Sequence, residues 1–60
     1  MNLLIAILFC LGLQTTPDQL NDADYLTENK VTIERANDII AHHWYIEKDG
    51  GVVIDPAVSP

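Results

Sequence analysis

The sequence predicts a mainly α-helical fold: an N-terminal apolar helix, then a short acidic helical hairpin and an extended C-terminal tail. Three observations lead to this prediction. Residues 3–13 carry no polar or charged side chain. Residues 33–46 place apolar side chains at helical spacing. Residues 50–60 are rich in glycine and proline, which do not continue a helix. We therefore divide the chain into an apolar anchor or signal-like segment, an acidic helical region and an extended tail, at residues 1–14, 15–49 and 50–60.

The composition excludes two classes of protein. Nine acidic residues face three basic ones, and the formal net charge is -6 at pH 7. Such a chain repels phosphate backbones, so we expect no nucleic-acid partner. Cys10 is the sole cysteine, so no disulfide within the chain is possible. A chain of 60 residues buries little surface, and we expect a partner or a bilayer to help stabilise it.

The apolar segment Met1–Leu13 has three interpretations. A membrane-crossing helix needs about 20 apolar residues, more than this run offers. A secretory signal has an apolar core of this length, but no Lys or Arg precedes it, and Cys10 and Gly12 make a poor cleavage site. An element buried within a larger complex fits the same run. We favour a membrane-associated anchor that contacts lipid, and the cleaved signal and the buried element stay open.

A helix start is predicted at Thr16. Thr16 suits the N-cap, Pro17 the first helical position and Asp18 the positive end of the helix dipole. Gln19 is placed to complete a capping box with Thr16. These residues predict a helix over about 17–26, followed by a turn at 27–30.

The next segment, 32–46, has the clearest helical pattern. Thr32 is a possible cap, and the polar residues Glu34 and Asp38 lie opposite an apolar arc. This pattern predicts an amphipathic helix whose apolar face binds a protein partner. The candidate partner-binding residues on that face are Ile33, Ala36, Ile39, Ile40, His43, Trp44 and Ile46.

The pair Asp49-Gly50 supports an alternative for residues 44–55. Asp-Gly between two short β-prone runs is typical of a β-hairpin, here pairing residues 45–47 with 52–54. Gly50 also suits the left-handed residue that ends a helix. We favour the helix to Ile46, because its apolar arc runs without a break from Ile33, and the hairpin is the alternative.

Candidate chemistry is sparse. His42 and His43 point about 100° apart on a helix, so they do not ligate one metal together. The pairs Asp38/His42 and His43/Glu47 each supply fewer ligands than a zinc site requires. We therefore expect no metal and no cofactor, although a metal-dependent protein using the two histidines is a further hypothesis.

Nucleophilic catalysis has no good candidate either. Cys10 lies in the apolar segment and Ser59 is next to the last residue. We expect no catalytic residue and no enzyme. The sequence instead predicts a small membrane-associated accessory or regulatory protein that binds a larger protein or complex. The alternative is a secreted or periplasmic binding module released from a signal peptide.

Overall fold

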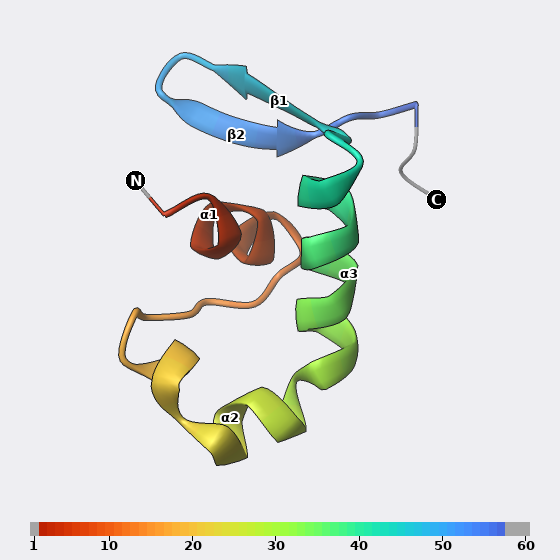
Figure 1. Ribbon diagram of the computed structural model, residues 1–60. Helices are drawn as coiled ribbons and strands as arrows, with labels where there is room; N and C mark the ends of the chain where they lie inside the picture. Colours follow the sequence, from red (N-terminus) through yellow and green to blue (C-terminus); the bar gives the residue numbers. More distant parts are fainter. Residues whose placement is uncertain (1, 58–60) are drawn as a thin grey trace.

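The computed structural model describes residues 2–57 of the chain, and in them three α-helices are followed by a two-stranded antiparallel hairpin (Figure 1). The order of elements is α1 (Leu3–Cys10), the 3-10 turn η1 (Gln19–Asn21), α2 (Ala23–Glu28), α3 (Lys30–Ala41), β1 (Tyr45–Lys48) and β2 (Gly51–Ile54). The helical character predicted for the chain is confirmed. The C-terminal element is the β-hairpin that the sequence offered as the alternative for residues 44–55.

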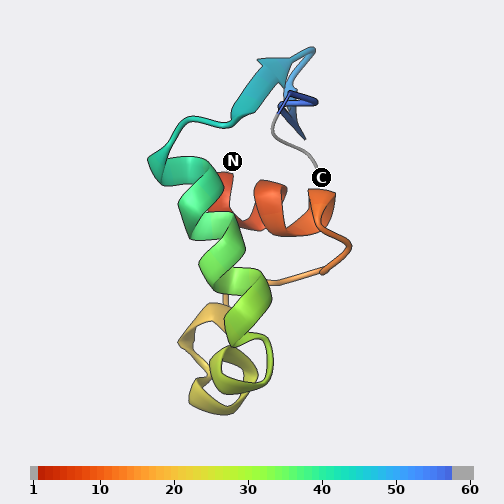
Figure 2. The same cartoon turned by 90° about the vertical axis from the view of Figure 1, so that its right-hand side faces the viewer.

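Helix α1 forms the centre of the fold. It lies across α3, and the hairpin lies above it in both views (Figures 1 and 2). Ile7 and Leu8 are fully buried, and they meet Ala36 and Ile39 of α3. Other side chains pack around this core while partly exposed: Leu3, Leu4, Leu11, Leu13, Leu20, Ile33, Ile40, Tyr45, Val52 and Ile54. Much of the core is therefore supplied by the apolar N-terminal segment.

Both ends of α1 are capped by hydrogen bonds from backbone N–H groups. At its start the Asn2 Oδ1 atom accepts a bond of 3.2 Å from the backbone N–H of Ile5. At its end Gly12 adopts a φ of 90°, and the N–H of Leu13 donates to the carbonyl of Leu8 over 2.9 Å. This is a Schellman motif. Within residues 2–57, no helix combines the length and the apolar character that crossing a bilayer demands.

The segment that follows forms the predicted capping box but not the predicted helix. The N–H of Thr16 donates to Gln19 Oε1 over 2.8 Å, and the N–H of Gln19 donates to Thr16 Oγ1 over 3.4 Å. Only the turn η1 follows, because Asp22 has extended backbone angles and begins a new helix. Its carboxylate accepts the N–H groups of Asp24 and Tyr25. The single helix expected over 17–26 is therefore two short elements.

Helix α3 occupies the first part of the expected 32–46 helix and ends earlier. It begins at Lys30, directly after Asn29, so the predicted turn at 27–30 is reduced to that one residue. It ends at Ala41, and Ile46 belongs to β1 instead. The prediction of a helix to Ile46 is wrong because His43 adopts a left-handed φ of 55°, which turns the chain out of the helix.

The two strands of the hairpin pair in a register that leaves a two-residue turn between them. Tyr45 pairs with Ile54, Ile46 with Val53, Glu47 with Val52 and Lys48 with Gly51. Asp49 and Gly50 both have positive φ, 52° and 76°, as a type I′ turn requires. Part of the predicted extended tail, Gly51–Ile54, therefore forms strand β2. The last residues of that prediction, 58–60, lie outside the described residues.

Candidate functional site

The two faces of the hairpin have different surroundings. Tyr45, Val52 and Ile54 pack against the core formed with α1 and α3. Successive side chains of a strand point to opposite faces, so Ile46 and Val53 project outward, where they are 43% and 48% exposed. Both faces of this small sheet therefore carry apolar side chains, and one of them faces solvent.

Trp44 extends this exposed surface. Its carbonyl accepts a hydrogen bond of 3.0 Å from the N–H of Asp55, so the ladder continues one pair beyond the strands. The alternation places Trp44 on the same face as Ile46, and its side chain is 38% exposed. We call Trp44, Ile46 and Val53 the outer patch.

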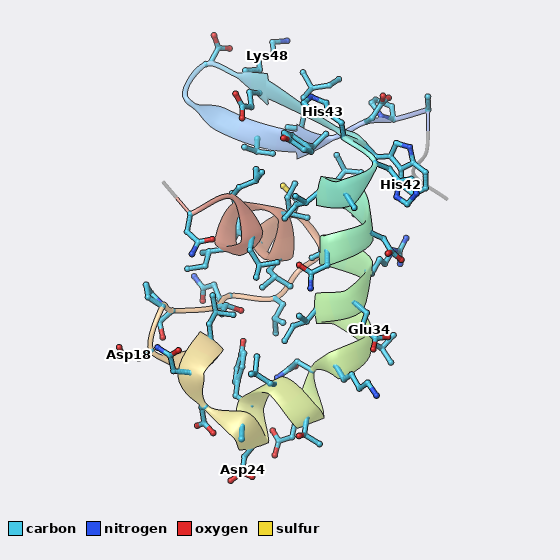
Figure 3. The ribbon with its side chains drawn as sticks, in the orientation of Figure 1. Asp18, Asp24, Glu34, His42, His43 and Lys48 are labelled. Atoms are coloured by element: carbon cyan, nitrogen blue, oxygen red, sulfur yellow. The ribbon has the colours of Figure 1, made fainter. Side chains whose placement is uncertain are left out.

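The indole of Trp44 is held by the residue two positions before it. The rings of His42 and Trp44 are stacked, with centroids 4.2 Å apart and an interplanar angle of 15°. The Nδ1 atom of His42 lies 2.8 Å from the carbonyl oxygen of Asp38, which fixes the imidazole on the last turn of α3. On the other side of the chain His43 stacks on Tyr45, with centroids 4.3 Å apart. Figure 3 shows His42 at the end of α3 and His43 beside the hairpin.

Two charged residues lie beside the outer patch. Lys48 shares its face by alternation, and Asp55 lies opposite Trp44 across the ladder. The one ion pair within residues 2–57 joins Lys30 to Glu34 at the other end of α3, with both side chains mostly exposed.

The residues predicted to bind a partner fall into two groups. Ala36 and Ile39 are buried against α1, and Ile33 and Ile40 pack partly buried on the same core. In this fold α1 thus covers that part of the predicted face. The other three are exposed at or beside the hairpin: His43, Trp44 and Ile46.

Val53 belongs to the outer patch but is not among the partner-binding residues predicted from the sequence. The signal that locates it is the Asp49-Gly50 turn, because a two-residue turn there sets Val53 directly opposite Ile46.

A second apolar surface lies where α1 faces the loop that follows it, away from the hairpin. Phe9 is 64% exposed and borders a hollow of about 490 Å³ between α1 and the loop that follows it. None of the described residues around this hollow is charged; they are Asn2, Ile5, Ala6, Phe9, Gln14, Thr15 and Pro17.

The His, Cys, Asp and Glu side chains of the described residues are dispersed over the structure. Among residues 2–57, no three His, Cys, Asp or Glu side chains are close enough to share a metal ion. The thiol of Cys10 donates to the carbonyl of Val52 over 3.1 Å and so links α1 to β2. Figure 3 shows Asp18, Asp24 and Glu34 pointing away from the body of the protein. These carboxylates lie on different sides of the molecule, and each is exposed to solvent.

Comparison of the chain with known protein families, curated proteins and solved structures gives no match. The outer patch and the uncovered side of α1 are therefore interpreted from their geometry alone.

Proposed function

We propose that this chain is a non-catalytic accessory or regulatory protein that binds a larger protein partner through the outer patch. The observation that carries the proposal is the position of Trp44, Ile46 and Val53. They lie side by side on the outward face of a hairpin whose inner face already packs on the core. A two-stranded sheet has marginal stability in water, and covering its exposed face with a partner stabilises it.

Trp44 is the residue we expect to contribute most to binding. Tryptophan is enriched among residues that dominate binding energy, because its large ring buries much apolar area. The stack with His42 holds this indole in one orientation before a partner arrives. Less side-chain entropy is then lost on binding.

The candidate residues of α3 position the hairpin and do not themselves contact the proposed partner. Ala36 and Ile39 hold α1 in place, and α1 in turn supports β2 from below. Trp44 and Ile46, together with Val53, form the surface that meets the partner, whereas the candidate His43 lies on the other side of the chain, stacked on Tyr45. Ile33 and Ile40 complete the packing that keeps the hairpin in position.

Affinity capture from the native host tests this proposal. The bait carries Trp44→Ala, Ile46→Ser or Val53→Ser, and the matched control is Val31→Ser on α3, which is 79% exposed and distant from the hairpin in the sequence. We expect the wild type and Val31→Ser to retain the same partner equally. Trp44→Ala should reduce retention at least about tenfold, the effect of removing a residue worth about 1.4 kcal/mol or more. Equal retention by all five baits, the wild type included, would refute the proposal.

Association with a membrane is a second candidate function, favoured by the exposed Phe9 and the uncharged hollow beside it. In this fold Ile7 and Leu8 face the core, so the contact with lipid is a peripheral one through the outer side of α1. The net charge of -6 favours neutral over anionic lipid. In a flotation assay with phosphatidylcholine vesicles, the wild type should float with the vesicles and Phe9→Ser should not. If neither protein floats with the vesicles, peripheral membrane association through α1 is excluded.

The alternative of a secreted module also has a test. Cleavage near Gly12 would remove Ile7 and Leu8, and with them half of the side chains that form the buried core. Intact-mass measurement on protein from the native host distinguishes the two cases. A chain that retains α1 supports the accessory protein, and loss of about a dozen N-terminal residues supports secretion.

A further inference from the structure

Among residues 2–57, no strand other than β2 pairs with β1, so one edge of β1 has no neighbour there. One of its edges pairs with β2, and β2 is the strand that packs on α1 (Figure 1). Hydrogen-bonded and non-hydrogen-bonded pairs alternate along an antiparallel ladder. The bond between Trp44 and Asp55 sets this alternation, so Tyr45 and Glu47 direct their backbone N–H and C=O groups away from β2. Within residues 2–57 no hydrogen bond to these backbone groups is formed.

We propose that a second copy of this chain occupies this edge, so that two β1 strands pair antiparallel about a two-fold axis at Ile46. In that register Tyr45 of one copy exchanges backbone hydrogen bonds with Glu47 of the other. Ile46 lies opposite Ile46, and Trp44 lies opposite Lys48. The backbone hydrogen bonds of the dimer use the edge of β1, which the proposed partner surface does not use, and its side-chain contacts involve Trp44 and Ile46 at the border of the outer patch.

Side-chain chemistry selects this register over its neighbours. Only residues that direct their backbone groups outward form hydrogen-bonded pairs, so the axis lies at Tyr45, Ile46 or Glu47. An axis at Glu47 sets two carboxylates directly opposite each other, which is destabilising. An axis at Tyr45 brings His43 into the ladder, where its left-handed φ of 55° does not fit a strand. The axis at Ile46 avoids both conflicts.

The contacts made in this register are complementary. The Lys48 ammonium of one copy approaches the indole of Trp44 of the other, as in a cation–π pair. The two Ile46 side chains form an apolar cross-strand pair. On the opposite face the Tyr45 hydroxyl is within reach of the Glu47 carboxylate. Because the axis is two-fold, the Trp44–Lys48 contact and the Tyr45–Glu47 contact each occur twice in the dimer.

Two consequences follow for the dimer. The outer patches of the two copies become continuous on a four-stranded sheet of order β2-β1-β1-β2, which enlarges the surface offered to a partner. The copies each carry a net charge of -6, so their long-range repulsion weakens the dimer at low ionic strength. Added salt screens that repulsion, and we expect the dimer to tighten with salt.

Disulfide trapping tests the register. Ile46→Cys is made in a Cys10→Ser background, and oxidised glutathione accepts the two electrons and two protons as the two thiols join. Non-hydrogen-bonded antiparallel partners have Cα atoms about 4.5 Å apart, which a disulfide spans. The matched control is Val53→Cys in the same background, since Val53 has similar exposure and faces the same side. In the dimer its symmetry mate is about three strand spacings away, roughly 14 Å.

We expect Ile46→Cys to form the covalent dimer at least about tenfold faster than Val53→Cys, because only its thiols lie within reach. Equal rates would overturn the proposed register, and a faster reaction of Val53→Cys would indicate that the outer faces stack instead. Circular dichroism of both reduced variants confirms that they share the wild-type fold before oxidation.

Sedimentation equilibrium gives a second test without cysteine chemistry. The wild-type mass should rise from 6.7 kDa toward twice that value with concentration. Ile46→Lys should remain monomeric because two ammonium groups would face each other, and Val53→Lys should still dimerise. A wild-type chain that stays monomeric at millimolar concentration in high salt would overturn the dimer.

Discussion

The backbone N–H of Trp44 donates a hydrogen bond of 2.9 Å to the carbonyl of Ile39, and this bond ends α3 and begins the path to the hairpin. The N–H of His43 donates to Ile40 over 3.2 Å, which completes a Schellman motif with His43 as its left-handed residue. Helix α1 ends in the same way, with Gly12 in the equivalent place. Two tight helix ends therefore allow so short a chain to fold back on itself.

Substitution of Gly12 should be costly for conformational reasons alone. A Cβ atom built at Gly12 meets nothing within 4 Å, but the φ of 90° is one that L-residues rarely adopt. We expect Gly12→Ala to lower the free energy of unfolding by about 1 kcal/mol. Gly51→Ala is the control, because Gly51 lies in β2 without a positive φ and its Cβ would make an ordinary contact. Urea denaturation followed by circular dichroism measures both, and equal effects would contradict the assignment of a left-handed helix end.

Truncation of Ile7 should unfold much of the protein. Its side chain is fully buried between α1 and α3, and Ile→Ala changes in cores cost about 2–5 kcal/mol. That loss is comparable with the whole stability of about 3–5 kcal/mol that so small a core supplies. The milder Ile7→Val should cost about 1 kcal/mol and remain measurable by thermal unfolding.

Phe9 provides the control on the same helix. It is larger than Ile7 but 64% exposed, so Phe9→Ala should change the free energy of unfolding by less than about 0.5 kcal/mol. A larger loss at Phe9 than at Ile7 would mean that the opposite side of α1 packs on the rest of the chain.

The hydroxyl of Tyr25 should stabilise the loop after α1. It lies 2.7 Å from Thr15 Oγ1, which is buried, and it donates to the carbonyl of Gln14 over 3.2 Å. Tyr25→Phe should therefore lower the free energy of unfolding by about 1–2 kcal/mol. A double-mutant cycle with Thr15→Val isolates the bond between the two side chains, and a coupling energy near zero would show that it contributes nothing.

Local sequence signals located several elements correctly. The capping box at Thr16 and Gln19 forms as expected, and the Asp49-Gly50 turn closes a hairpin. The apolar spacing of residues 33–40 marks the side of α3 that faces the core. Each of these signals depends on residues that are close in sequence, which is why they could be found without a structure.

Other features depend on contacts between distant residues. The apolar segment is apolar on all sides, so its pattern gave no face by which to predict that Ile7 and Leu8 pack on α3. The left-handed conformation of His43 has no sequence signature as clear as glycine, and the helical arc was therefore extended too far. Val53 entered the outer patch only through its pairing with Ile46.

The apolar N-terminal segment forms the core on which α3 and the hairpin are assembled. Residue-resolved amide hydrogen exchange on the 60-residue chain measures whether α1 is as stable as the rest of this core. We expect the amides of Ile7, Leu8 and Leu11 to exchange as slowly as those in the middle of α3, because global unfolding is needed to expose both. Exchange of the α1 amides at the rate of a free peptide, while α3 remains protected, would show that α1 is not part of the folded core.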